Sequence, residues 1–162
     1  MVAVASSGLV ARWAHLYADS KALSAGVNFV HLAGILVAGG FAIVTDRASL
    51  LLAPEGGTDV LRELERGRGV HVWVLGGLAV TAASGVLQLF SDLHTYLTST
   101  LFWAKMALIA LLLLNGWVRL RVERDLQAGS AASWRRFRLT SGVSLVLWFT
   151  VLLAGVFLTT IS

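Results

Sequence analysis

Two residues that can take part in redox or metal chemistry interrupt long apolar stretches of this chain. His31 lies within FVHLAGILVAGG, and Lys105 lies within LFWAKMALIALLLL. An ionisable group inside such a stretch is costly unless it has a partner, so it indicates a functional site. A neutral imidazole is a good ligand for haem iron, and an ammonium group can balance an anion such as a haem propionate or an acidic substrate.

Two amides and a second histidine complete the set of candidate residues. At 1.5 Å per residue, His31 lies about 12 Å and Lys105 about 6 Å from the same end of their stretches. Asn28 and Gln88 approach this level, whereas His71 lies at the opposite end. The sequence therefore predicts a cofactor site formed by His31, Asn28, Gln88 and Lys105. Lys105 is its candidate catalytic residue, His31 is its metal ligand, and His71 is a second candidate metal ligand.

Each of these residues also has a simpler interpretation. Lys105 lies near enough to the membrane surface to extend its ammonium group to the lipid headgroups. His31 could hydrogen-bond Asn28 or a neighbouring helix without further function. A structural or solvated role is expected for His71, and solvent exposure is expected for His15 and His94. Asp46 and Arg47 are read most simply as a solvated helix end.

The composition is that of a membrane protein. Of the 162 residues 57% are hydrophobic and 14% are charged, and the mean hydropathy is +0.78. A spanning helix needs about 20 apolar residues. Four apolar segments meet this length, and they are predicted at residues 23–45, 70–90, 101–118 and 139–161. The prediction is an all-α integral membrane protein, an antiparallel four-transmembrane-helix bundle that occupies residues 1–162 as one domain in the lipid bilayer.

The connecting segments predict the orientation of the spans. The first and third carry many arginines, whereas the second, SDLHTYLTST, carries no Lys or Arg. Basic loops remain on the cytoplasmic side. We therefore expect a multi-pass protein of the bacterial inner membrane with periplasmic N- and C-termini. Residues 1–20 read as a short interfacial amphipathic helix, because Leu9, Trp13 and Leu16 share one face.

Small and polar residues form one stripe along each predicted span. Such residues let helices approach closely, and the core of a helix bundle is where cofactors bind. The stripe of the first span contains Ser24, Asn28, His31, Gly34, Ala38 and Ala42. That of the second contains Gly77, Thr81, Ser84 and Gln88. The third contains Lys105, Ile109, Leu112, Gly116 and Arg119, and the fourth contains Ser141, Ser144, Trp148 and Gly155.

Several kinds of chemistry are excluded by the residues that are missing. The chain has no cysteine, so it forms no disulfide, iron–sulfur cluster or thioether-linked haem. No phosphate-binding loop or hydrolase motif occurs. Its net charge of +4 is expected to face anionic lipid, and no nucleic-acid partner is predicted.

Three segments resemble a known group of membrane proteins. They are FVHLAGILVAGGFAIVTDR, FWAKMALIALLLLNGW and the basic loop RVERDLQAGSAASWRRFR. Together they resemble the HemJ-type protoporphyrinogen oxidases and the related CopD-like small four-helix membrane proteins. The resemblance implies haem b ligated by His31, an activity that needs Lys105, and oxidation of a porphyrinogen. One or two haems and a quinone acceptor are the expected cofactors.

Two other functions remain open on this sequence. The chain could be a non-catalytic accessory subunit of a larger electron-transfer or photosynthetic membrane complex, or a homo-oligomer, with its apolar faces docked on other spans. A transporter is disfavoured, because no carboxylate precedes Asp46 in the spans to form a proton or cation relay. The copper handling suggested by the CopD comparison is also disfavoured, since two methionines and no cysteine are a poor ligand set for Cu(I).

Overall fold

The computed structural model describes residues 8–51, 57–127 and 133–161, and nearly all of them are helical. The helices, in chain order, are α2 (Gly8–Asp19), α3 (Lys21–Leu51), α4 (Gly57–Ser91), α5 (Leu93–Thr98), α6 (Thr100–Gln127) and α7 (Ser133–Ile161). The described residues contain no strand. The prediction of an all-α protein is confirmed.

Four of the helices are long and apolar enough to cross a membrane. They are α3, the part of α4 from Gly69 to Ser91, α6, and α7 as far as Leu158. The chain is therefore a multi-pass membrane protein, as its hydropathy predicts. Helices α3 and α6 continue beyond the predicted apolar segments, because charged residues at the end of a span do not interrupt the backbone hydrogen bonds of a helix.

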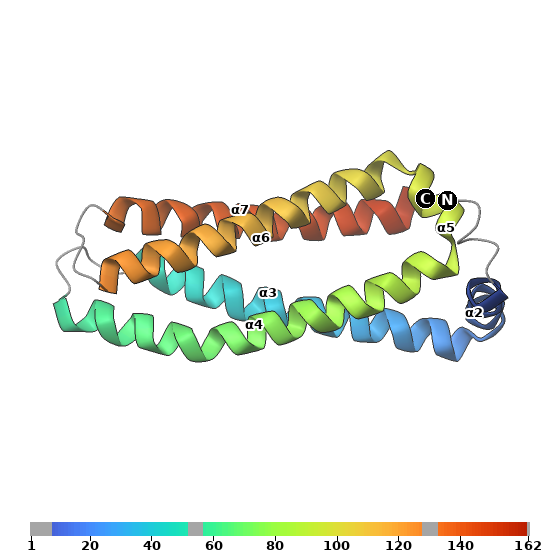
Figure 1. The fold of residues 1–162 in the computed structure, drawn as a ribbon, viewed down its shortest axis with the longest axis horizontal. Coiled ribbons are helices and arrows are strands. Elements are labelled where there is room, and N and C mark those ends of the chain that lie inside the picture. Colours follow the sequence, from blue (N-terminus) through green and yellow to red (C-terminus); the bar gives the residue numbers. More distant parts are fainter. Residues whose placement is uncertain (1–7, 52–56, 128–132, 162) are drawn as a thin grey trace.

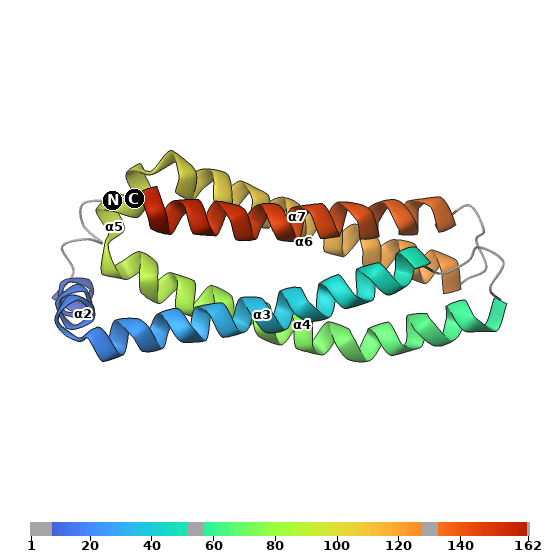
Figure 2. The same ribbon diagram turned by 180° about the vertical axis from the view of Figure 1, so that it is seen from behind.

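The long helices lie side by side, and the chain reverses direction between consecutive ones (Figures 1 and 2). Helix α3 packs on α4 and α7, and α6 packs on α7. The short helices α2 and α5 lie at one end, here called the α5 end. The opposite end, where α3 stops and α7 begins, is called the Arg119 end. A site in this protein is therefore assigned to one end or the other.

Three of the helices that begin at the α5 end, namely α3, α5 and α6, have a side chain that caps the first turn. The hydroxyl of Ser20 accepts a hydrogen bond from the backbone N–H of Leu23 at the start of α3 (3.2 Å). Asp92 caps α5 through the N–H of Thr95 (3.1 Å), and Ser99 caps α6. These residue types stabilise helix starts because the first N–H groups have no partner within the helix.

Glycine sets the distance between α3 and α4. A Cβ added to Gly77 would lie 2.7 Å from the backbone nitrogen of Ala38, and one added to Gly34 would lie 2.9 Å from the carbonyl oxygen of Gly77. The two backbones are thus in direct contact. Lipid tails are as apolar as leucine, so close packing rather than the hydrophobic effect holds such helices together. The predicted small-residue stripes of these two spans face each other.

A tryptophan joins α3 to the other pair of helices. Trp148 of α7 is buried and packs with Ala38 and Leu112 in the central apolar cluster. A Cβ at Gly39 would lie 3.2 Å from its indole ring, so this glycine admits the ring against the backbone of α3. The amide of Asn115 on α6 donates to the carbonyl oxygen of Thr140 on α7 (2.9 Å).

Candidate functional site

His31 is positioned by α4. Its Nδ1 lies 3.1 Å from the carbonyl oxygen of Thr81 and 3.1 Å from the hydroxyl oxygen of Ser84. The carbonyl can only accept, and the Ser84 hydroxyl lies within donating distance of the carbonyl oxygens of Val80 (2.7 Å) and Thr81 (3.1 Å). Nδ1 is therefore the nitrogen that carries the proton. The lone pair of the neutral ring is then on Nε2, which is free of hydrogen bonds to the described residues.

The side chain of Lys105 is half-buried and lies against α7. Its Nζ lies 3.6 Å from the position that a Cβ would take at Gly155 of α7. The side chain thus lies between α6 and α7 in the half of the molecule that contains His31.

The two predicted amides bind each other at the α5 end of the same stripe. Nε2 of Gln88 donates to Oδ1 of Asn28 (2.8 Å), one helical turn from His31. The hydroxyl of Tyr17 on α2 contacts the same oxygen (3.5 Å). Burial raises the pKa of Tyr17, and Tyr96 adds to the rise. The phenol therefore remains a neutral donor at neutral pH.

Helix α2 is tied to the α5 end by a second contact. The indole nitrogen of Trp13 donates to the carbonyl oxygen of Leu87 near the end of α4 (2.8 Å). Together with the Tyr17 contact, this places α2 against α3 and α4 beside the Asn28–Gln88 pair. The N-terminal helix is thus part of the surroundings of the predicted site.

His71 does not join this group. It lies near the other end of the α4 span, about 20 Å along the helix from Ser84. His15 and His94 are exposed, as expected. In the described ranges no three His, Cys, Asp or Glu side chains are close enough to hold a metal ion together.

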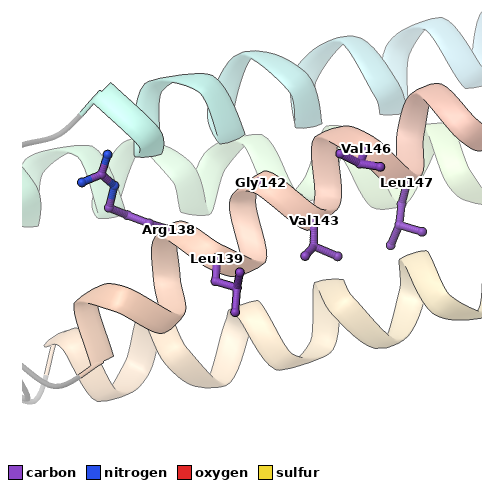
Figure 3. A pocket seen from close by; sticks show the side chains of 6 residues that line it. All are labelled: Arg138, Leu139, Gly142, Val143, Val146 and Leu147. Atoms are coloured by element: carbon purple, nitrogen blue, oxygen red, sulfur yellow. The ribbon is translucent and has the colours of Figure 1, made fainter.

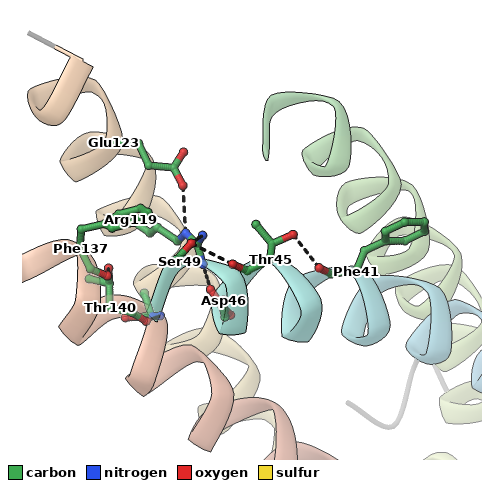
Figure 4. Close-up of polar contacts among 9 residues, drawn as sticks. Phe41, Thr45, Asp46, Ser49, Arg119, Glu123, Phe137 and Thr140 are labelled. Carbon is green, nitrogen blue, oxygen red and sulfur yellow. Dashed lines mark hydrogen bonds and ion pairs between the residues drawn. The ribbon is translucent and has the colours of Figure 1, made fainter. Parts of the chain in front are cut away.

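The Arg119 end contains a buried charge network (Figure 4). The guanidinium of Arg119 pairs with Oδ1 of Asp46 through Nη1 and with Oε1 of Glu123 through Nε (2.9 Å). Its Nη2 donates to the hydroxyl oxygen of Ser49 (2.9 Å). The ring centroid of Phe137 lies 5.4 Å from the guanidinium carbon. One arginine thus pairs with two carboxylates, one from α3 and one from its own helix α6.

This network corrects the interpretation of Asp46 as a solvated helix end, because its exposed fraction is only 1%. The sequence contained the signal. Asp46 follows Ala42 by four residues and continues the polar stripe of α3, and Arg119 ends the stripe of α6. Lys105 and Arg119 thus belong to one helix face but to opposite ends of the molecule.

The surface of the helix bundle has a cleft and a groove. A cleft of about 270 Å³ at the Arg119 end is lined by all four long helices. A shallow groove of about 480 Å³ runs along α7 and is lined by Arg138, Leu139, Gly142, Val143, Val146 and Leu147 (Figure 3). All six belong to one helix, and Arg138 at the end is the only charged residue among them. The groove is therefore part of an apolar outer surface.

Comparison with known proteins adds no further assignment. No protein-family model, curated protein or solved structure matches the chain. Functional inference therefore depends on the side chains described above.

Proposed function

We propose that this chain is a haem b-binding redox protein of the membrane, with His31 as the iron ligand and Lys105 as the cation beside it. The observation that supports the proposal most is the hydrogen bond from Nδ1 of His31 to the Thr81 carbonyl oxygen. Metal-bound histidines usually donate their second ring N–H in this way, which fixes the tautomer and the ring orientation. The free Nε2 is then the ligating atom.

The donor set fits a haem better than a bare metal ion. A porphyrin supplies four nitrogen ligands of its own, so one histidine suffices to hold the iron, whereas a bare ion needs several protein ligands. Lys105 supplies a charge that matches a propionate or an acidic substrate. When bound, the haem would supply one-electron chemistry. The residues of the chain would hold and orient it.

The remaining residues have supporting roles. Asn28, held by Gln88 through its carbonyl oxygen, has its amide N–H groups available as donors for an anionic group at the α5 end. We assign this end to the periplasmic side, because the basic segments lie at the Arg119 end. In this proposal α2 is an amphipathic helix at the outer surface of an antiparallel bundle in a bacterial inner membrane.

Optical spectra of the purified protein, supplemented with haem, test the proposal. The wild-type chain should show the Soret and α bands of a b-type haem in reduced-minus-oxidised spectra. His31→Ala should lose them, whereas His94→Ala, at an exposed histidine on α5, should keep them. Lys105→Met should keep the bands and lower the rate of porphyrinogen oxidation. A wild-type protein without these bands, or an unchanged His31→Ala spectrum, would rule the proposal out.

A further inference from the structure

The cleft at the Arg119 end combines an apolar wall with one buried polar group whose hydrogen bonds are incomplete. Its lining includes Leu78 of α4 and Leu112 of α6, with the indoles of Trp117 and Trp148. Asp46 also lines it. Oδ1 of Asp46 pairs with Arg119, but Oδ2 is buried without a hydrogen-bond donor among the described residues. A buried oxygen of a carboxylate without a donor is costly, so a bound donor would stabilise it.

The cleft opens toward lipid. Residues on its two sides are large, apolar and exposed, with exposed fractions of 64% for Leu75 on α4 and 50% for Trp117 on α6. Helix α4 packs mainly on α3 and α6 on α7, so the side between α4 and α6 is the open one. In a membrane this side faces hydrocarbon, and a ligand that enters here must dissolve in the bilayer.

The charges of the lining decide the polar group of the ligand. The lining contains one carboxylate, Asp46, and one guanidinium, Arg119, which form an ion pair, and Arg119 also pairs with Glu123 outside the lining. An ammonium group would stand beside Arg119, and a carboxylate would stand beside Asp46. A neutral hydroxyl avoids both repulsions, because it carries no charge and can donate to Oδ2 of Asp46. The cleft volume of about 270 Å³ is slightly below the usual range for ligand sites. It therefore suits one ring rather than a large cofactor.

We propose that this cleft binds a lipid-soluble aromatic alcohol, of the phenol class, whose hydroxyl donates to Asp46 while its ring lies among Leu78, Leu112, Trp117 and Trp148. The site lies at the opposite end of the spans from His31 and uses none of the residues assigned to haem. The site is therefore additional to the redox function proposed above. A test of either proposal does not decide the other.

Binding of para-octylphenol to the full chain in lipid nanodiscs, measured by titration calorimetry, tests this site. Its methyl ether is the matched probe, because it has the same ring and tail but no donor. The wild-type protein should bind the phenol saturably and at least about tenfold more tightly than the ether, as expected when a hydrogen bond to a charged group is lost. Equal affinity for both probes, or no saturable binding of the phenol, overturns the proposal.

Two glycines provide a matched pair of blocking variants. Gly116 lines the cleft and Gly40 does not, and a Cβ at either meets nothing within 4 Å. Gly116→Leu should therefore fill the cleft and weaken phenol binding at least about tenfold, as loss of most ring contacts predicts, whereas Gly40→Leu should bind as the wild type does. Wild-type affinity in Gly116→Leu would show that the phenol binds elsewhere and would refute the assignment.

Asp46→Asn tests the polar contact itself. The amide oxygen of asparagine should face Arg119, as Oδ1 does, so the amide nitrogen takes the place of Oδ2 and donates instead of accepting. The preference for the phenol over its ether should therefore disappear. The ratio of two affinities measured on one variant does not depend on how stable that variant is. A preference that persists in Asp46→Asn means that Asp46 is not the acceptor. His31→Ala should bind the phenol normally, so loss of haem and loss of this site remain distinguishable.

Discussion

Arg119 is the residue on which two buried carboxylates depend. Replacing it with leucine leaves Asp46 and Glu123 without their cation in a buried environment. Breaking a buried ion pair by removing one partner costs about 3–5 kcal/mol. We therefore expect Arg119→Leu to lower the free energy of unfolding in mixed micelles by an amount in this range, measured by denaturant titration.

The control for this change is the neighbouring arginine Arg124, which is exposed on the same helix. Arg124→Leu should alter the free energy of unfolding by less than about 0.5 kcal/mol, as surface changes usually do. The double variant Asp46→Leu with Arg119→Leu should be more stable than Arg119→Leu alone, because it removes one stranded charge. If the single and double variants are equally unstable, Asp46 and Arg119 are not energetically coupled.

At the scale of residues, the sequence shows single polar residues but not the partners that neutralise them. His31 and Lys105 stand out because apolar neighbours surround them. Asp46 is followed by Arg47, and this adjacency made a solvated helix end the simpler reading. The true partner of Asp46 is 73 positions away on α6, and only the packing of α3 and α6 around α7 brings it near. The stripes place each of the two residues on a polar helix face, but no local pattern pairs them.

At the scale of helices, the contact between α3 and α4 depends on Gly77. A Cβ there would lie 2.7 Å from the nitrogen of Ala38, so Gly77→Leu must push the two helices apart. Overpacking of this kind costs about 1–3 kcal/mol. We expect a lower midpoint of thermal unfolding, followed by circular dichroism in detergent.

The adjacent glycine provides the control. A Cβ at Gly76 meets nothing within 4 Å. Gly76→Leu should therefore leave the thermal midpoint unchanged or raise it slightly, because leucine favours the helix more than glycine does. If both variants are equally unstable, the loss comes from the helix surface in general and not from the α3–α4 contact.

Helix α5 depends on Asp92 in a way that varies with pH. Hydrogen bonds from Thr95 hold the pKa of this carboxyl below its usual value. Since the pKa is lower in the folded state, the stabilisation is present at neutral pH and is lost as the pH falls through the folded-state pKa, below about 4. Amide exchange at Thr95 should therefore accelerate there, after correction for the intrinsic rate.

Two variants separate the charge of Asp92 from its capping. Asp92→Asn keeps an acceptor oxygen, so it should retain most protection at neutral pH and lose the acid-dependent step. Asp92→Ala removes the cap, which costs about 1 kcal/mol and should accelerate exchange roughly fivefold at every pH. If amide exchange in Asp92→Asn accelerates at low pH as much as in the wild type, the acceleration comes from another titrating group.

The existence and order of the membrane helices follow from hydropathy, but their lateral arrangement does not. The stripe from His31 to Ala42 correctly predicts that one face of α3 contacts small residues of α4. The second contact of α3, Gly39 with the indole of Trp148, lies on another face, and two adjacent glycines in an apolar run do not show which of them meets a partner. Hydropathy therefore defines the helices, whereas side-chain shape decides which helices are neighbours.

For the molecule as a whole, the charges of the connecting segments predict its direction in the membrane. The chain has no cysteine, so one introduced cysteine can report the side on which it lies. His94 on α5 and Arg124 on α6 are both exposed and lie at opposite ends of the spans. His94→Cys should react with a membrane-impermeant maleimide in cells with a permeable outer membrane and an intact inner one. Arg124→Cys should react only after the inner membrane is opened, because positively charged segments remain in the cytoplasm. The reverse pattern would place His31 and Lys105 in the cytoplasmic half of the bilayer, and any acidic substrate would then have to reach them from that side.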